Sequence, residues 1–354
     1  MTTLFLGLEQ GLMRVELNGD ARAHWAMKDV SAFSVAIDPQ EPEYVICTTL
    51  GQGVFRSEDG GRSFEPGGDG VTFPSVWASS ISSTERTSAG GVVYVGTLPS
   101  AMFRSEDGGR TFRELESFRA LPSLPEASFP AAPRTSLVHM IATSFNRERT
   151  VFAGIELGGI MRSSDGGETW QETAGGLDCH QLLAHPMAPD RVYESDGGGF
   201  CESLDNGETW TVDYEGIPEH LSYFYDMAVD PGDPDTIVIS VGPNQYQAHG
   251  INPYAYYEGA FDRSSVLPNT YSTLFRRCGG IWTEMRNGLP AAEGHSQGRF
   301  ATALGDDTGH VYYVTIPGDV YRTTDGGDSW SAVDVTFPPD ADGRMVHCAR
   351  AVNG

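Results

Sequence analysis

Short apolar runs alternate with turns rich in glycine and proline along most of the chain. In segments 33–49, 182–195 and 226–240, an apolar run leads into an Asp-Pro or His-Pro step, a second proline and another apolar run. Segments 138–155 and 299–315 repeat this rhythm without the prolines. These patterns predict pairs of β-strands joined by turns. No long helical periodicity interrupts them.

A ten-residue segment follows most of these strand pairs and occurs in five clear copies. The copies are FRSEDGGRSF (55–64), FRSEDGGRTF (103–112), MRSSDGGETW (161–170), CESLDNGETW (201–210) and YRTTDGGDSW (321–330). Their shared core lets an aspartate accept backbone hydrogen bonds and a glycine adopt positive φ. We therefore interpret Asp59, Asp107, Asp165, Asp205 and Asp325 as structural turn residues, because one active site does not need five equivalent copies. A decayed copy surrounds Trp282.

The repeated segment resembles the Asp-box, or BNR repeat, of β-propellers in the sialidase-like superfamily, within an uncharacterised branch. The resemblance covers most of the chain and implies a propeller fold, but it leaves the chemistry to be argued from the site. True sialidases carry an arginine triad and an Arg-Ile/Leu-Pro motif before the first box. The arginines before Ser57 are Arg14, Arg22 and Arg56, and none begins that motif. We therefore do not expect a sialidase.

Counting the units predicts an all-β, seven-bladed β-propeller with Asp-box turns, formed as one domain over residues 1–354. Six blades are expected at about 32–68, 75–117, 135–175, 179–216, 224–290 and 298–335. Residues 1–26 lack a first strand, and residues 344–354 form a first strand with nothing after it. Together they complete the seventh blade, and such closure removes exposed sheet edges.

Composition narrows the expected partners. The net charge of −25 argues against nucleic acid and anionic membranes. No apolar run is long enough to span a membrane, and the opening MTTLFLGLEQ lacks a basic leader and a cleavage site. The five cysteines are odd in number and show no CxxC spacing, which favours a reducing compartment. We therefore expect a cytoplasmic protein whose ligand or substrate is a small molecule.

The first strands of the seven units carry one set of equivalent positions around the central channel. These positions are Phe33, Trp77, His139, His180, Tyr225, Arg299 and His347. Three neutral imidazoles at one level suit a divalent transition metal such as Zn, Fe, Cu or Mn, and an arginine suits a carboxylate or phosphate. The sequence therefore predicts a metal site at this level. Its ligands would be His139, His180 and His347, with Tyr225 and Arg299 as catalytic neighbours.

Loop residues map to the same face of the predicted propeller. His220 and His295 lie in the loops that enter blades, and His249 lies in an unusually long insertion, 243–272, that is rich in tyrosine. Long loops of this kind often serve as lids or binding loops. His185 and His310 are expected on the opposite face.

Three functions remain open. The first is a metal-dependent enzyme that acts on a small anionic molecule at the channel mouth, with Glu156 and Asp196 as acid, base or orienting groups. The second is a binding or assembly propeller without catalysis, in which the channel histidines are only hydrogen-bonded structural groups. The third is a glycoside hydrolase that uses Glu156 and Asp196 as its carboxylate pair.

Overall fold

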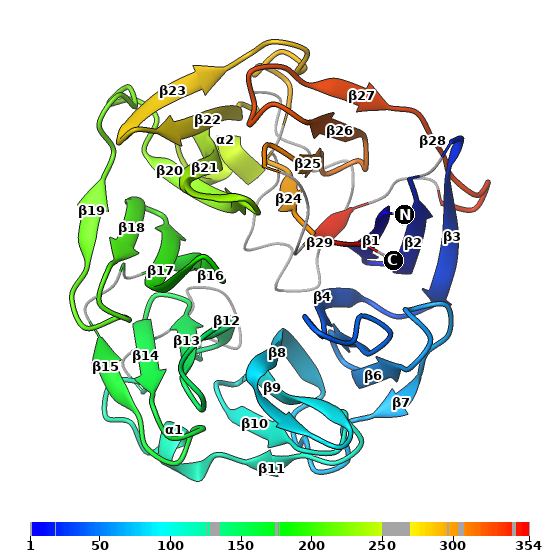
Figure 1. The fold of residues 1–354 in the computed structure, drawn as a ribbon, viewed down its shortest axis with the longest axis vertical. Helices are drawn as coiled ribbons and strands as arrows, with labels where there is room; N and C mark the ends of the chain where they lie inside the picture. Colours follow the sequence, from blue (N-terminus) through cyan, green and yellow to red (C-terminus); the bar gives the residue numbers. More distant parts are fainter. Residues whose placement is uncertain are drawn as a thin grey trace.

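Seven small sheets surround a central axis in the computed structural model, which confirms the predicted seven-bladed β-propeller (Figure 1). The structure describes residues 2–17, 19–125, 127, 135–173, 176, 178–249, 270–295, 297–303, 308–341 and 345–353. In six sheets the strands pair in chain order, with the first strand beside the axis and the last at the rim (Figure 1). We number these blades 1 to 6 from β4 onward and name the seventh, which contains both chain ends, the closing blade.

The bounds of the strands follow the pattern of apolar runs and turns. The innermost strands are β4 (Ala32–Ile37), β8 (Ser75–Thr87), β12 (Val138–Thr143), β16 (Cys179–His185), β20 (Tyr223–Asp230), β24 (Arg299–Ala301) and β29 (Val346–Asn353). The second strands are β5 (Val45–Thr49), β9 (Gly90–Leu98), β13 (Val151–Ile155), β17 (Ala188–Asp196), β21 (Asp233–Gly242), β25 (Val311–Val314) and β1 (Thr2–Leu8). These second strands are almost entirely buried, as expected for strands with neighbours on both sides.

The outer half of each blade is a hairpin. Its third strands are β6 (Gly53–Ser57), β10 (Met102–Ser105), β14 (Gly159–Ser163), β18 (Gly199–Ser203), β22 (Thr273–Cys278), β26 (Val320–Thr323) and β2 (Gly11–Glu16). The rim strands are β7 (Glu65–Gly67), β11 (Arg113–Glu114), β15 (Gln171–Thr173), β19 (Thr211–Asp213), β23 (Ile281–Met285), β27 (Ser331–Val333) and β3 (Ala21–Lys28), with β28 (Val335–Thr336) pairing parallel to β3. Two short helices, α1 (Glu116–Arg119) and α2 (Gln245–His249), complete the described elements. Neither helix has the length and apolar character that crossing a membrane requires, and the described residues contain no other candidate.

The closing blade joins the two ends of the chain. β29 pairs antiparallel with β1 from Thr2–Asn353 to Leu8–Val346, and the N and C labels lie side by side in Figure 1. Because successive side chains of a strand point to opposite faces, β1 packs on both neighbouring blades. Leu4 clusters with Val314 of blade 6, and Phe5 clusters with Val45 of blade 1.

The repeated segments form the turns between the third strand and the rim strand, as predicted. In blade 1, Ser57 Oγ donates to Asp59 Oδ1 at 2.8 Å, and Gly61 N donates to Ser57 Oγ at 2.9 Å. Ser63 N donates to Asp59 Oδ1 at 3.0 Å, and Ser63 Oγ donates to Oδ2 at 2.6 Å. Burial raises the pKa of Asp59, but these hydrogen bonds outweigh it and lower the pKa to about 2. The aspartate is therefore an ionised acceptor that closes the turn.

The second glycine of each repeated turn lies against the preceding blade. Gly61 has φ of 72°, and a side chain there would overlap the ring of Phe5 in the closing blade. The equivalent contacts are Gly109 with Ile46, Gly167 with Leu115, Gly207 with Phe152 and Gly327 with Met285. The turn thus serves as a spacer between neighbouring blades as well as a hairpin.

Blade 5 departs from this pattern. The segment around Trp282 forms the β22–β23 hairpin, so the fifth expected unit is present. Gly279 and Gly280 replace the aspartate turn between Cys278 and Ile281. Of the long insertion, residues 250–269 lie outside the described part of the chain.

Removal of residues 344–354 should open the closing blade, because β1 loses its inner partner and its unpaired edge becomes exposed. We expect a large fall in melting temperature and aggregation, measured by differential scanning fluorimetry and size-exclusion chromatography. A synthetic peptide of residues 344–354, added in trans, should raise the melting temperature again. A truncated chain that stays monomeric with the wild-type melting temperature would contradict closure by β29.

Replacing Asp165 by alanine should cost about 1–3 kcal/mol of unfolding free energy, because the hydroxyls of Ser163 and Thr169 and the amide of Thr169 lose their acceptor. Chemical denaturation would measure this loss. Asp20→Ala is the matched control, since Asp20 is exposed and should change stability by less than about 0.5 kcal/mol. An Asp165 variant with normal stability would contradict the structural role of the repeated turns.

Candidate functional site

A ring of seven side chains, one from each blade, crosses the central channel at the level predicted from the sequence. In six blades the innermost strand changes register at this position, so that one extra residue bulges from the pairing with the second strand. The bulged segments contain Phe33, Trp77, His139, His180, Tyr225 and His347. A β-bulge re-aims the side chain that it carries. Arg299, at the start of β24, supplies the seventh member.

Neighbouring members of this ring contact one another in blade order. The ring centroids lie 4.9 Å apart for His347–Phe33, 4.4 Å for Phe33–Trp77, 6.0 Å for Trp77–His139, 6.2 Å for His139–His180 and 5.3 Å for His180–Tyr225. The Arg299 guanidinium stacks on Tyr225 at 4.4 Å. The predicted set is thus one connected layer. His139 and His180 are adjacent in it, whereas Phe33 and Trp77 separate His139 from His347.

Backbone carbonyls fix the two adjacent imidazoles. His139 Nδ1 donates to Cys179 O at 2.9 Å, and His180 Nδ1 donates to Phe224 O at 2.7 Å. Each acceptor directly precedes the ring residue of the next blade, so the same link is made twice. A ring nitrogen fixed in this way leaves Nε2 unprotonated when the imidazole is neutral, which is the arrangement typical of metal-bound histidine.

Two carboxylates surround His180. Glu156, at the turn after β13, Asp178, just before β16, and His180 offer donor atoms that all lie within 4.8 Å of one another. Asp178 Oδ2 lies 3.3 Å from His180 Nε2. Glu156 Oε2 and Asp178 Oδ1 are buried and accept no hydrogen bond, although Glu156 Oε2 lies 2.8 Å from His139 Nδ1. Buried carboxylate oxygens without donors are costly, so this cluster is a candidate cation site.

A second group of three lies deeper in blade 4. Glu194, Asp196 and Cys201 also place their donor atoms within 4.8 Å of one another. Glu194 is fully buried, and one oxygen accepts from Gly176 N at 3.0 Å while the other has no partner. Burial, followed by the charge of Asp196, raises the pKa of Glu194 to about 7. Glu194 can therefore carry a proton at neutral pH.

Neighbouring charges raise the pKa of His180 and lower the pKa of His347. Burial alone would lower the pKa of His180, but the charges of Asp178 and Glu156 raise it to about 9. Burial raises the pKa of Asp178, and His180 more than reverses that effect. Burial, aided by the charge of Arg299, lowers the pKa of His347 to about 3. His347 is therefore neutral at pH 7, whereas a metal-free His180 is a cation paired with Asp178.

The structure places the site residues predicted from the sequence in different groups. Glu156 and His180 share one cluster, Asp196 belongs to the other, and His347 belongs to neither. Tyr225 and Arg299 lie in the ring. The loop histidines His220 and His295 lie before β20 and β24, with His220 exposed, and His249 ends α2.

The control residues lie where they were expected. His185 ends β16 and donates from Nε2 to Asp230 O at 3.0 Å, and His310 directly precedes β25. Both lie at the turns between the first and second strands, away from the ring.

Asp178 and Glu194 were missed by the sequence interpretation. Asp178 lies two residues before His180, in the loop that leads into β16, so its position beside a ring histidine was the signal in the sequence. Glu194 and Asp196 lie two residues apart on β17, so strand alternation places them on the same side. The spacing of two residues therefore indicates from the sequence that Glu194 lies beside Asp196.

No protein-family model and no curated protein sequence matches the chain. Its fold resembles that of solved structures at low identity. The GH74 xyloglucanase from Xanthomonas campestris is 15% identical, with a TM-score of 0.63 over 93% of this chain and 55% of the enzyme. An ancestral GH74 enzyme is 14% identical, with a TM-score of 0.58 over 93% of this chain and 47% of that protein. This chain thus spans about half the length of these GH74 enzymes.

A protein of similar length shares the fold as well. YCF48, in a complex with a D1 peptide, is 15% identical, with a TM-score of 0.54 over 86% of this chain and 83% of that protein. The neighbours thus include enzymes and a peptide-binding propeller. At these identities the likeness shows the fold alone, a seven-bladed β-propeller.

In metal-free, EDTA-treated protein, NMR should show His180 titrating near pH 9. A folded pKa above the unfolded value of about 6.5 means that protonated His180 stabilises the fold fully below pH 6.5. This contribution disappears as the pH rises through 9. Asp178→Asn should return the pKa toward 6.5, and the exposed His24 is the control. Titration of wild-type His180 near 6.5 would contradict the ion pair.

Proposed function

We propose that the chain is a metal-dependent enzyme that acts on a small anionic molecule at the channel mouth. The observation that carries the proposal is the convergence of Glu156, Asp178 and His180, with two buried carboxylate oxygens that accept no hydrogen bond. A divalent cation would satisfy both oxygens and offset the negative charge that gathers there. The proposed ligand set keeps His180 from the sequence prediction and replaces His139 and His347 by two carboxylates.

The donor set suits Zn, Mn or Fe, since imidazole and carboxylate ligands serve all three. Such an ion supplies Lewis acidity and lowers the pKa of bound water. The chain supplies the orientation, because Phe224 O accepts a hydrogen bond from His180 Nδ1 and holds that ring. Asp178 and Tyr223 line an open hollow of about 580 Å³ beside the cluster, which gives a small substrate access. Tyr223 OH lies 3.3 Å from His180 Nε2.

The guanidinium of Arg299 favours a substrate that carries a negative charge. This guanidinium follows Tyr225 in the ring, and its buried Nε atom makes no hydrogen bond. A guanidinium recognises carboxylate or phosphate groups through a planar fork of donors.

Protein purified without a histidine tag should retain close to one equivalent of metal, measured by inductively coupled plasma mass spectrometry. Asp178→Asn and Glu156→Gln should each weaken Zn²⁺ or Mn²⁺ binding in calorimetry by at least tenfold, because each removes a charged ligand. His24→Gln is the exposed control and should bind normally. His347→Gln should also bind normally, which separates this cluster from a site made by the three strand histidines. Metal retained by both carboxylate variants would overturn the proposed ligand set.

A glycoside hydrolase is the second candidate, and the pair Glu194–Asp196 favours it over the originally expected pair Glu156–Asp196. Glu194, with a pKa near 7, has the properties of a general acid. Its neighbour Asp196 lines the open hollow. The GH74 neighbours, one of them a xyloglucanase, make xyloglucan oligosaccharides the natural probe.

Activity assays with and without EDTA separate the two enzymes. Metal-dependent cleavage of an anionic probe such as p-nitrophenyl phosphate, lost in Asp178→Asn, supports the first proposal. Cleavage of xyloglucan oligosaccharides that survives EDTA and is lost in Asp196→Asn or Glu194→Gln supports the second. A protein that binds no metal and cleaves neither probe would be a binding propeller, as the peptide complex of YCF48 illustrates for this fold.

A further inference from the structure

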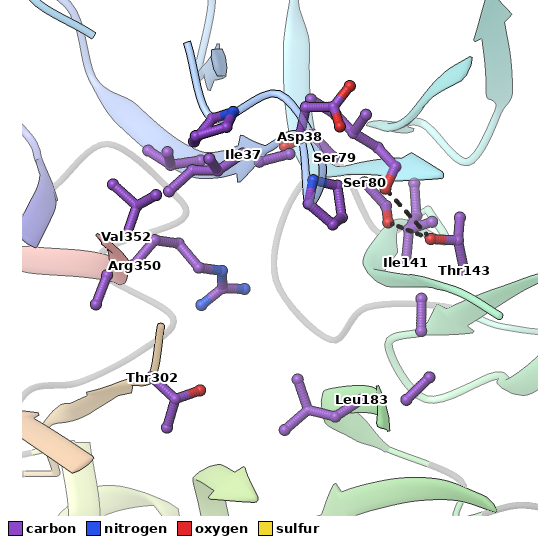
Figure 2. A pocket seen from close by; sticks show the side chains of 18 of the residues that line it. Ile37, Asp38, Ser79, Ser80, Ile141, Thr143, Leu183, Thr302, Arg350 and Val352 are labelled. Atoms are coloured by element: carbon purple, nitrogen blue, oxygen red, sulfur yellow. Dashed lines mark hydrogen bonds between the residues drawn. The ribbon is translucent and has the colours of Figure 1, made fainter. Parts of the chain in front are cut away.

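The other end of the channel contains a separate cavity of about 280 Å³. Its walls come from the innermost strands and the proline-containing turn after β4 (Figure 2). None of the ring residues and none of the carboxylates of the candidate metal centre line it. It is therefore a second place where a small molecule could bind.

Arg350 is the positively charged residue that lines this cavity. It lies three residues beyond His347 on β29, about 10 Å further along the strand. Figure 2 shows its guanidinium extending from the strand into the opening. Within the described part of the chain, its one hydrogen bond runs from Nη1 to the neighbouring Ala349 O at 2.8 Å, and it forms no ion pair.

The carboxylate that lines the cavity is already engaged. Asp38 is 1% exposed and accepts from Arg86 Nη1 at 2.8 Å. It also accepts from the backbone amides of Gly91 at 2.8 Å and Gln40 at 2.9 Å. Asp38 is therefore neutralised by its own partners and leaves the charge of Arg350 uncompensated.

The remaining walls combine hydroxyl groups with apolar side chains (Figure 2). Ser80 and Thr143 share a hydrogen bond of 3.2 Å, and Thr143 Oγ1 donates to Ile81 O at 3.5 Å, so the remaining lone pairs of the two hydroxyls can accept a further bond. Ile37, Ile141 and Val352 supply apolar surface to the walls of the cavity. One cation, several hydroxyls and apolar walls are the features of a pocket for a small molecule with one charged end and an apolar body.

We propose that this cavity binds a small organic monocarboxylate, with the carboxylate on Arg350 and a short apolar chain against the neighbouring side chains. The guanidinium matches a carboxylate through two parallel hydrogen bonds. A phosphate dianion would meet one cation among the lining residues, so its second negative charge would have no partner. This inference concerns the channel end opposite the candidate metal centre and does not depend on the proposed function.

The test is calorimetric titration of the full chain with hexanoate. We expect Arg350→Gln to weaken binding at least tenfold and Arg350→Lys to weaken it less, because lysine keeps the charge but not the fork. Arg322→Gln is the matched control, since Arg322 is exposed on β26 and forms no ion pair among the described residues. Hexanamide, which has the same shape without the charge, should bind at least tenfold more weakly than hexanoate.

The melting temperature of each variant in the absence of ligand shows whether it is folded. Arg350→Gln should melt as the wild type does, because Arg350 hydrogen-bonds only to its own backbone neighbour among the described residues. Equal affinity for hexanoate in Arg350→Gln, or for hexanamide in the wild type, would overturn the proposal. Tighter binding of inorganic phosphate than of hexanoate, or no binding of hexanoate at all, would also overturn it.

Discussion

The antiparallel pairing of β29 with β1 is the interaction on which the rest of the molecule depends. It converts a row of blades into a closed ring and leaves no innermost strand missing. It also carries His347 into contact with Phe33 and places Arg350 in the opposite cavity. One strand of eight residues thus contributes to the fold, to the ring of seven side chains and to the second cavity.

The register shift in the innermost strands shapes the channel. In a regular strand, successive side chains point alternately toward the two neighbouring blades. A bulge changes the direction of one of these side chains. Because the shift recurs at the same level in six blades, large side chains meet across the axis. The resulting layer separates the acidic mouth from the cavity below it, so the two ends of one channel have different chemistry.

The sequence predicted the fold more fully than the site. Repeats reveal architecture because every blade packs against its neighbours in the same way. The turns, the closing blade and the ring positions therefore recur as equivalent positions in the sequence. The cluster around His180 cannot be read in this way, because Asp178 has no counterpart that repeats between blades. Its role depends on how a loop folds over β16. His139 and His347 share a level in the channel but are not neighbours in the ring, because Phe33 and Trp77 lie between them.

The glycines of the repeated turns always pack against the preceding blade, never the following one, in the contacts described above. Gly109, Gly167 and Gly207 each rest on a blade that precedes their own in the chain. A nascent chain leaving the ribosome can therefore stack each new blade on one that is already made. The closing blade is the exception, since β1 precedes the other six blades in the chain and its partner β29 follows them. Until β29 has been made, β1 keeps an open strand edge that can pair with another strand.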